Sequence, residues 1–370
     1  MIVGDPRTPP EQARGVVGQR AGHEISWFSA HETGLPGVRH FSMPRFSRKQ
    51  AATRALLTPV YLRRALGRIQ PDLVHVHYAQ TGLMAFPLSR FHPLVVTVMG
   101  GDILPDQGYR GLPAYFVRML LDKADCITSK SGFLDEALEK IGRYRSKIRR
   151  ITWGVDLSLF RPNRDVGGLR KRWDIPARDL VFFDPRLARP FYKKHLILEA
   201  FSGYLRTGGP PATLLIAEAF ADPDYVRRLR AQASSLQVSG GVRFVGAIPP
   251  TEMPDYYVLA DLTISAAPSD GLPQTIFEAY ACGSFLILSD LPQYAGIVQD
   301  GIMGRLVPVG QILPLQDALS WAVANPGIRE RAKQLGRRYV EEHADFDRQA
   351  MLVNDIYRDL LDAASHERAC

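Results

Sequence analysis

The sequence predicts an α/β protein made of two consecutive doubly wound domains, each with a parallel sheet covered by helices. Strand-like and helix-like segments alternate almost from one end of the chain to the other, which is the pattern of stacked βα units. The 370 residues are too many for one ordinary core and suit two domains. With 46% hydrophobic and 23% charged residues, the composition is that of a globular protein.

The expected elements follow one another in βα order. In the first half, strands are expected at residues 25–28, 73–77, 94–99, 126–128 and 150–153, with helices at 11–20, 48–69, 112–123 and 133–141. In the second half, strands are expected at 180–183, 213–217, 242–245, 262–265 and 285–288, and two helical stretches at 328–344 and 348–364 end the chain. The segment 154–162 follows a strand and ends at a proline, so the domains are expected to meet there.

The composition limits the cellular compartment in which the protein is expected and the kind of partner that it can bind. The longest apolar runs are strand-sized and too short to span a bilayer, and the first residues show no secretion signal, so a cytoplasmic protein is expected. Cys126, Cys282 and Cys370 have no metal-ligand spacing and fit a reducing compartment. The net charge of +8 allows anionic partners without choosing among them. The basic residues are not arranged around aromatic side chains on which bases could stack, or along a helix that could enter a DNA groove. A nucleic-acid partner is therefore not expected.

The richest loop and helix run from residue 265 to residue 289. Pro273 is expected at the first helical position, which makes Leu272 the cap, and a leucine side chain cannot cap. The amides of Gln274 and Thr275 are then left without a local partner. A helix start with such amides and a positive dipole end suits an anion such as a diphosphate.

Two carboxylates accompany this helix start. Glu278 lies four residues after Gln274 on the same helix face, and a carboxylate there can accept hydrogen bonds from both hydroxyls of a ribose. Asp270 lies outside the helix and is placed to approach a sugar. The alternative is that Asp270 only shapes a turn and that Glu278 is a solvated helix residue.

This segment resembles the signature of the retaining glycosyltransferases of family 4, which have the GT-B fold. The family has two acidic residues separated by seven others, followed by Glu-Ala-Met-Ala-Cys-Gly or a close relative, and here the pair is Asp270 and Glu278 with the tail Glu-Ala-Tyr-Ala-Cys-Gly. Weaker matches in the expected order include residues 22–25, 71–77, 154–162 and 242–246. The resemblance implies that Glu278 binds the ribose and that Asp270, with Gly271 and Leu272 beside it, meets the donor sugar.

The GT-B fold implies two Rossmann-like domains that face each other across a cleft, with the last helices returning to the first domain. We therefore assign residues 1–160 to an acceptor-side domain, 161–345 to a domain that binds the nucleotide sugar, and 346–370 to a helix that crosses back. In doubly wound sheets, ligands bind at the carboxyl ends of strands.

The resemblance also implies two cations that neutralise the leaving diphosphate, as the chemistry requires when charge develops on the leaving group. Arg186, just after the first strand of the second domain, matches the family's arginine. Lys193 and Lys194 are both candidates for the lysine, although neither precedes the usual glycine. The alternative is a solvated basic turn. These side chains take the place of a divalent ion in members that need no metal, so neither a metal nor a resident cofactor is expected.

In the first domain, Gly100 and Gly101 close a buried strand and allow a ligand to approach the backbone closely. Asp102 matches an aspartate of the family that could orient the acceptor or the donor sugar; the alternative is that it caps a turn. Met99 stands where the family often has a histidine. The loops at residues 4–10 and 292–296 lack the family's paired glycines, which indicates an unusual acceptor or lost activity.

Two other features of the first domain have open interpretations. His75 and His77 share one face of a strand, where strand-end packing or a substrate hydrogen bond is favoured over metal binding because no third ligand is near. The segment from Arg45 to Arg68 has seven basic residues and no acid. It is either a basic amphipathic helix that attaches to anionic lipid or a helix packed on the sheet with an arginine-rich outer face.

The sequence therefore predicts a retaining hexosyltransferase that moves a sugar from a nucleoside-diphosphate sugar to a glycan, a lipid-linked or a small-molecule acceptor. Bacterial surface polysaccharide or glycoconjugate biosynthesis is the expected setting, in the cytoplasm and with attachment to the inner face of the plasma membrane as an open alternative. Two other functions remain: a nucleotide-sugar enzyme such as an epimerase, and a non-catalytic relative that acts as a partner subunit.

Overall fold

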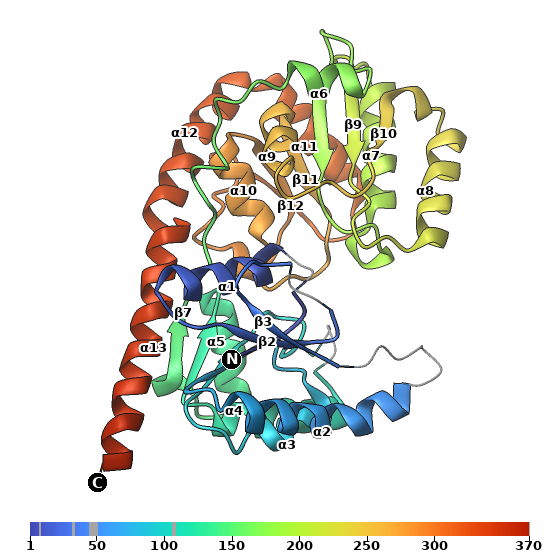
Figure 1. Cartoon of the computed structure of the whole chain (residues 1–370). Helices are drawn as coiled ribbons and strands as arrows, with labels where there is room; N and C mark the ends of the chain where they lie inside the picture. Colours follow the sequence, from blue (N-terminus) through green and yellow to red (C-terminus); the bar gives the residue numbers. More distant parts are fainter. Residues whose placement is uncertain (7–8, 32–33, 44–50, 106–108, 370) are drawn as a thin grey trace. The chain divides into compact units, whose positions relative to one another are not determined.

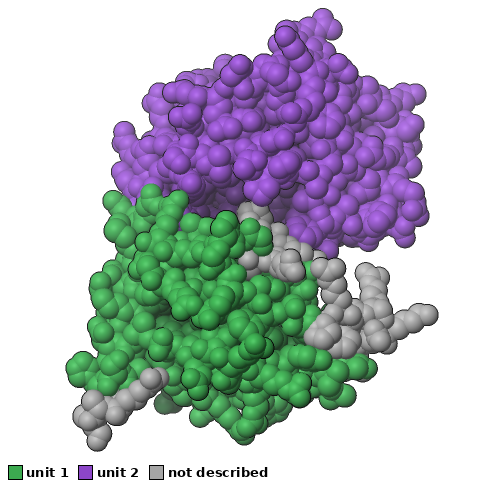
Figure 2. Space-filling view, viewed as in Figure 1, with its two compact units in different colours: residues 1–153, 347–370 green, residues 154–346 purple. Residues whose placement is uncertain are grey.

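The computed structural model describes residues 1–6, 9–31, 34–43, 51–105 and 109–369. The chain divides into two compact units, one formed by residues 1–153 and 347–370 and the other by residues 154–346 (Figure 2). The division precedes residue 160, where the sequence placed it, because Val155 and Phe160 pack in the core of the second unit. Among the described residues, no helix has the length and apolar character needed to cross a bilayer.

Unit 1 is built on a parallel sheet with the strand order β3-β2-β1-β4-β5-β6-β7 in the described part of the chain. Its strands are β1 (Ile2–Val3), β2 (Ser26–Ser29), β3 (Arg39–Ser42), β4 (Val74–His77), β5 (Leu94–Thr97), β6 (Cys126–Ser129) and β7 (Ile148–Arg150). The central strands are buried along their whole length, as expected for a parallel sheet covered on both faces.

The helices of unit 1 lie around this sheet (Figure 1). They are α1 (Pro9–Arg20), α2 (Ala51–Ile69), α3 (Ala85–Leu88), α4 (Gly111–Lys123), α5 (Gly132–Ile141) and most of α13 (Phe346–Ala369). The last of these joins unit 1 although almost two hundred residues of unit 2 separate it from the rest. Tyr357 of α13 is hydrogen bonded to His75 of β4, with 2.5 Å between Oη and Nδ1.

Unit 2 contains a second parallel sheet with the order β10-β9-β8-β11-β12-β13. Its strands are β8 (Leu180–Asp184), β9 (Ala212–Ile216), β10 (Val242–Phe244), β11 (Leu262–Ser265), β12 (Phe285–Ser289) and β13 (Gly304–Val307). Its helices are α6 (Gly167–Arg172), α7 (Lys194–Arg206), α8 (Pro223–Ser235), α9 (Met253–Leu259), α10 (Gln274–Cys282), α11 (Ile312–Ala324) and α12 (Pro326–His343).

The strand order of unit 2 reverses between β8 and β11. The chain runs outward from β8 through β9 to β10, then returns to place β11 on the other side of β8. At such a reversal the loops after the two central strands diverge and leave room for a ligand. The loop after β8 carries Arg186 and the loop after β11 carries Asp270, so the two side chains belong to the same edge of the sheet.

The predicted elements and the structure differ mainly at the edges of the sheets. The edge strands β3 and β13 have no counterpart among the predicted strands, and neither has the two-residue strand β1 inside the first sheet. The strand expected at residues 150–153 is observed as β7, which ends at Arg150, and Trp153 instead has a positive φ of 66°. The start of the basic segment, from Arg45 to residue 50, lies outside the described residues.

Candidate functional site

Arg186 and Asp270 form an ion pair at the reversal point of the second sheet. The distance from Arg186 Nη2 to Asp270 Oδ2 is 2.5 Å, and the side chains are only 11% and 12% exposed. Arg186 Nη1 also donates to the hydroxyl of Thr275, at 3.4 Å, in the first turn of α10. The structure thus brings together three residues that the sequence assigned to the diphosphate and the donor sugar.

Burial and the neighbouring charges act on Arg186 in opposite directions. Burial tends to lower the pKa of its guanidinium, but the Asp270 carboxylate and three nearby tyrosines raise it, so the pKa lies above its usual value. The guanidinium lies over the ring of Tyr192, 4.7 Å from its centroid, where a cation–π contact stabilises the charge. Within the described part of the chain, the buried Nε has no hydrogen-bond partner and is available as a donor.

Helix α10 begins at Gln274, with Pro273 as its cap residue and without a capping side chain. The expected start at Pro273 with Leu272 as the cap is therefore wrong by one residue, because Pro273 has the extended backbone that a cap residue adopts. Leu272 is buried and has a positive φ of 81°, a conformation that leucine rarely takes. The uncapped start that the sequence predicted is present.

The positive end of α10 and Arg186 lie against each other, because Arg186 reaches Thr275 in the first turn. A cation beside the positive end of a helix dipole is unfavourable unless an anion is also present. Asp270 supplies one negative charge at this position, and its Oδ1 also accepts from the amide of Gly271, at 2.8 Å. The electrostatics therefore favour anions at this edge.

The two lysines differ sharply in their environment. Lys194 is completely buried and forms an ion pair with the equally buried Asp184, with 2.8 Å between Nζ and Oδ2. Burial raises the pKa of Asp184 and lowers that of Lys194, while their mutual attraction opposes both shifts. Lys193 is half-buried and has a left-handed backbone at the start of α7. A solvated basic turn is therefore wrong for Lys194.

Asp184 is a site residue that the sequence reasoning missed. Its Oδ1 accepts from the amide of Arg186, at 3.0 Å, so one carboxylate fixes the backbone of the arginine and binds the buried lysine. The available signal was a carboxylate at the carboxyl end of the apolar run Leu-Val-Phe-Phe-Asp, a position where a charge is costly unless it has a partner.

Glu278 is half-buried, and its Oε2 accepts from the hydroxyl of Tyr257 in α9, at 2.8 Å. Burial and this carboxylate raise the pKa of Tyr257 well above its ordinary value. Glu278 is thus held in place and is not a freely solvated helix residue. The side chain of Gln274 is directed toward the first residue of unit 2, because its Nε2 donates to the carbonyl of Gly154 at 3.1 Å.

In unit 1, Asp102 is fully buried, and its carboxylate is occupied by backbone amides. Oδ2 accepts from Ala79, at 2.7 Å, and Oδ1 accepts from Met99 and Gly100, both at 3.0 Å. Burial raises its pKa, and these hydrogen bonds oppose the shift. This is the geometry of the alternative in which Asp102 holds a turn together. Gly100 has a φ of 111°, so the turn requires a glycine, and the half-exposed Gly101 follows it.

His75 and His77 stack with 4.0 Å between their ring centroids. The two ring nitrogens of His75 are taken by Tyr357 and by the Thr97 hydroxyl, the latter at 2.7 Å. Among the described residues, no group of three or more His, Cys, Asp or Glu is placed to hold a metal ion. His75 packs against Tyr357 of α13, and both histidine rings pack against Trp153.

Two family models match this chain. The model described as "Glycosyltransferase Family 4" matches residues 18–159, and the model described as "Glycosyl transferases group 1" matches residues 170–339. Between them the two matches take in most of both units. The chain belongs to the group 1 glycosyltransferases.

The names of several relatives of this chain refer to a lipid or to inositol phosphate. The α-monoglucosyldiacylglycerol synthase of Streptococcus pneumoniae is 27% identical over 264 residues, which cover 66% of this chain and 57% of the synthase. This chain thus spans little more than half the length of that relative. The D-inositol 3-phosphate glycosyltransferase of Kribbella flavida is 24% identical over 296 residues, covering 74% of this chain and 68% of that protein.

Solved structures confirm the predicted fold class of this chain. Sucrose-phosphate synthase from Thermosynechococcus elongatus has a TM-score of 0.82 at 19% identity and covers 98% of each chain. Anabaena HepE in complex with UDP-glucose has a TM-score of 0.81 at 15% identity, covering 97% of this chain and 99% of HepE. At these identities the likeness shows the fold alone, which is the GT-B arrangement of two Rossmann-like units.

Proposed function

We propose that this glycosyltransferase moves a hexose-type sugar from a nucleoside-diphosphate sugar to an acceptor hydroxyl with retention of anomeric configuration. The observation that carries the proposal is the cluster of Arg186, Asp270 and Thr275 at the uncapped start of α10. In the reaction, the bond from the anomeric carbon to the diphosphate breaks and a bond to the acceptor oxygen forms. The acceptor proton leaves with the released nucleoside diphosphate.

The diphosphate fits the charge at this edge of unit 2. Arg186 has a donor without a partner among the described residues, and the helix end adds a positive dipole next to it. Lys193 flanks the same loop, and Lys194 lies beneath it in its ion pair with Asp184. Fixed cations stabilise a developing negative charge without reorganisation, so we propose that the reaction requires no divalent metal and no resident cofactor.

Glu278 and Asp270 have separate roles in this proposal. One oxygen of Glu278 accepts from Tyr257, which orients the carboxylate toward the ribose hydroxyls. Asp270 neutralises Arg186 before the donor binds and turns to the hydroxyls of the donor sugar when the diphosphate takes the arginine. In unit 1, Gly100 and Gly101 provide backbone for the acceptor, with Asp102 as the residue that holds their turn.

The acceptor is proposed to be carried by lipid, in bacterial glycoconjugate or surface polysaccharide synthesis on the cytoplasmic face of the membrane. The names of the relatives from Streptococcus and Kribbella support an acceptor with a lipid or a phosphate. Helix α2 supports it independently, because the large apolar residues Leu56, Leu57 and Val60 are exposed beside exposed arginines. A face that combines apolar and basic side chains suits an anionic lipid surface.

Donor binding is the first test of the proposal. The full chain is screened by thermal shift with uridine, guanosine and adenosine diphosphates and their sugars, because a ligand that binds the folded state raises Tm. The stabilising sugar is then offered with a panel of lipid and soluble acceptors in EDTA, and the anomeric configuration of the product is read by NMR. We expect transfer with retention. A sugar isomerised without acceptor would show an epimerase, and binding without any turnover would show a partner subunit.

Membrane attachment is tested separately by flotation with anionic and with neutral vesicles at low salt. We expect the protein to float with the anionic vesicles, and Leu56→Ser with Val60→Ser to abolish flotation. Thr53→Ala, an exposed change in the same helix, serves as the control. Equal binding to neutral and anionic vesicles would contradict the proposed attachment to anionic membranes. It would leave the proposed donor reaction unaffected.

A further inference from the structure

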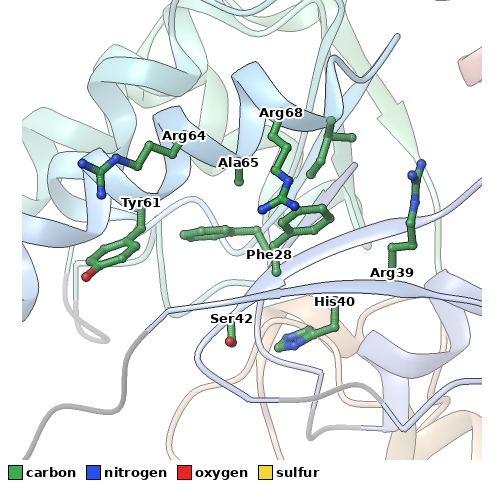
Figure 3. A pocket seen from close by; sticks show the side chains of 10 residues that line it. Phe28, Arg39, His40, Ser42, Tyr61, Arg64, Ala65 and Arg68 are labelled. Atoms are coloured by element: carbon green, nitrogen blue, oxygen red, sulfur yellow. The ribbon is translucent and has the colours of Figure 1, made fainter.

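Unit 1 contains a pocket beside helix α2 to which neither the donor nor the acceptor was assigned above. It lies between the edge strand β3 and helix α2 and has a volume of about 570 Å³ (Figure 3). Its lining combines arginines with aromatic and small side chains: Phe28, Arg39, His40, Phe41, Ser42, Tyr61, Arg64, Ala65, Arg68 and Ile69. All of these residues lie in the described part of the chain, and none belongs to the loops that carry Gly100 or Asp270.

Three arginines line this pocket. Arg64 and Arg68 are four residues apart on α2, and Arg39 extends from β3. In Figure 3 the guanidinium of Arg68 points into the pocket near Phe28, whereas that of Arg64 points away from Arg68, on the side of Tyr61. No carboxylate is among the lining residues that the structure describes, and helix α2 contains no acid in its sequence. Arg39 has an exposed ion pair with Glu24, whereas Arg64 and Arg68 form no ion pair or hydrogen bond with the described residues. Like charges at this spacing repel each other, so the arrangement favours a bound anion.

The other wall of the pocket is apolar. Phe28 of β2 and Phe41 of β3 are register partners on one face of the sheet, and Arg39 shares that face because it lies two residues before Phe41. Tyr61 lies one helical turn before Arg64 and contributes a ring to the same pocket. Guanidinium groups form paired hydrogen bonds with phosphate oxygens, while aromatic rings pack against a sugar ring or a hydrocarbon stem. The pocket therefore matches an anion attached to an apolar or ring-shaped group.

We propose that this pocket is a binding site for a phosphate monoester, held by Arg68 with Arg64 and Arg39 at its rim. The monoester could be the head of a membrane lipid or a soluble phosphorylated molecule, and both present the same group to the arginines. The site is independent of the proposed donor chemistry, because every residue in it belongs to unit 1 and the diphosphate residues belong to unit 2.

The test compares two double variants of the full chain that remove the same charge from α2. Arg64→Gln with Arg68→Gln changes the pocket, whereas Arg54→Gln with Arg63→Gln changes exposed arginines of the same helix that do not line it. Affinity for inorganic phosphate and for glycerol 3-phosphate is measured by calorimetry. Binding to phosphatidylcholine vesicles is measured with added phosphatidic acid, a monoester, or with added phosphatidylglycerol, a diester.

We expect the pocket variant to lose about tenfold or more in affinity for the monoester, since two charged hydrogen-bond donors are removed, and the control variant to lose much less. Loss toward phosphatidic acid alone identifies a lipid head, and loss toward the soluble esters alone identifies a soluble ligand. Equal losses in both double variants would show a diffuse surface charge and overturn the proposal, as would unchanged affinity in the pocket variant. Thermal unfolding of each variant shows that it is folded, and donor binding in unit 2 stays unchanged.

Discussion

Arg186 is bound to Asp270 across the reversal point of the second sheet, with 2.5 Å between Nη2 and Oδ2 and both side chains largely buried. In the proposed reaction the arginine serves the diphosphate and the aspartate serves the sugar. Without a donor, the guanidinium of Arg186 is therefore bound to Asp270 and not to a diphosphate, and the carboxylate of Asp270 is bound to Arg186 and not to a sugar. A donor has to separate them, which costs free energy in binding and releases the carboxylate at the place where the sugar arrives.

Asp270→Asn is expected to tighten the binding of the nucleoside diphosphate and to reduce transfer. Removing the carboxylate frees Arg186 for phosphate, and a gain of about tenfold corresponds to roughly 1.4 kcal/mol of competition removed. Calorimetry with the diphosphate found in the donor screen measures the gain. Asp300→Asn removes a more exposed partner of Arg305 in the same unit and serves as the control. Weaker binding of the diphosphate to Asp270→Asn would refute the competition.

Glu278→Ala is expected to abolish transfer and to weaken donor binding by about ten- to a hundredfold, because a carboxylate that accepts from two hydroxyls is lost. Tyr257→Phe removes the hydrogen bond that orients Glu278 and should produce a smaller loss, mostly in donor affinity. Glu330→Ala, an exposed glutamate in α12, is the matched control. Unchanged donor affinity and turnover in Glu278→Ala would remove the assignment of this residue to the ribose.

Asp184→Asn is expected to destabilise unit 2 by about 3–5 kcal/mol, since it leaves the buried Lys194 without its counter-charge. Adding Lys194→Met should recover much of this loss, because the pair is then replaced by uncharged groups of similar volume. Urea unfolding of the two single variants and the double variant gives the coupling. The double variant also tests the lysine: activity close to that of the natural protein would assign the second cation to Lys193.

Tyr204 gives the stability of unit 2 a dependence on alkaline pH. Its side chain is fully buried, and burial raises its pKa from 10 to about 12. A raised folded-state pKa means that the folded protein holds the proton more tightly, so this contribution is complete below pH 10 and is lost as the pH rises toward 12. The loss amounts to roughly 2–3 kcal/mol.

Tyr204→Phe, which cannot ionise, should flatten the decline in unfolding free energy between pH 10 and about 12. It should also cost about 1 kcal/mol at neutral pH, because the hydrogen bond to the carbonyl of Pro210 is lost. Tyr115→Phe, at an exposed position in α4, is the control and should leave the slope as it was. An unchanged slope in Tyr204→Phe would place the alkaline sensitivity elsewhere.

The sequence was sufficient for most of the strands that are buried on both faces, because their apolar runs are long, and β11 was predicted at its observed bounds. It missed the buried strand β1, which has only two residues, and the edge strands β3 and β13. β3 reads Arg-His-Phe-Ser and β13 reads Gly-Arg-Leu-Val, and such short, partly exposed segments have the composition of loops. Only pairing with a neighbouring strand makes them strands, and that pairing is not visible in a local pattern.

The candidate site shows the same limit. Arg186, Asp270 and Glu278 could be named from local spacing and family resemblance, and the structure places the first two in contact. The burial of Lys194 could not be foreseen, because it depends on Asp184, a strand residue ten positions earlier. The three amides that occupy Asp102 include one from Ala79, which follows a neighbouring strand. The local sequence did not predict hydrogen-bond and ion-pair partners that come from another part of the fold.

The return of α13 to unit 1 makes that unit discontinuous along the chain, with all of unit 2 inserted between its parts. During synthesis unit 2 emerges whole and can complete its sheet, whereas unit 1 has to wait for Tyr357 before the hydrogen bond to His75 of its fourth strand can form. The strands of unit 1 are thus made first, but its contacts with α13 can form only after all of unit 2 has been made.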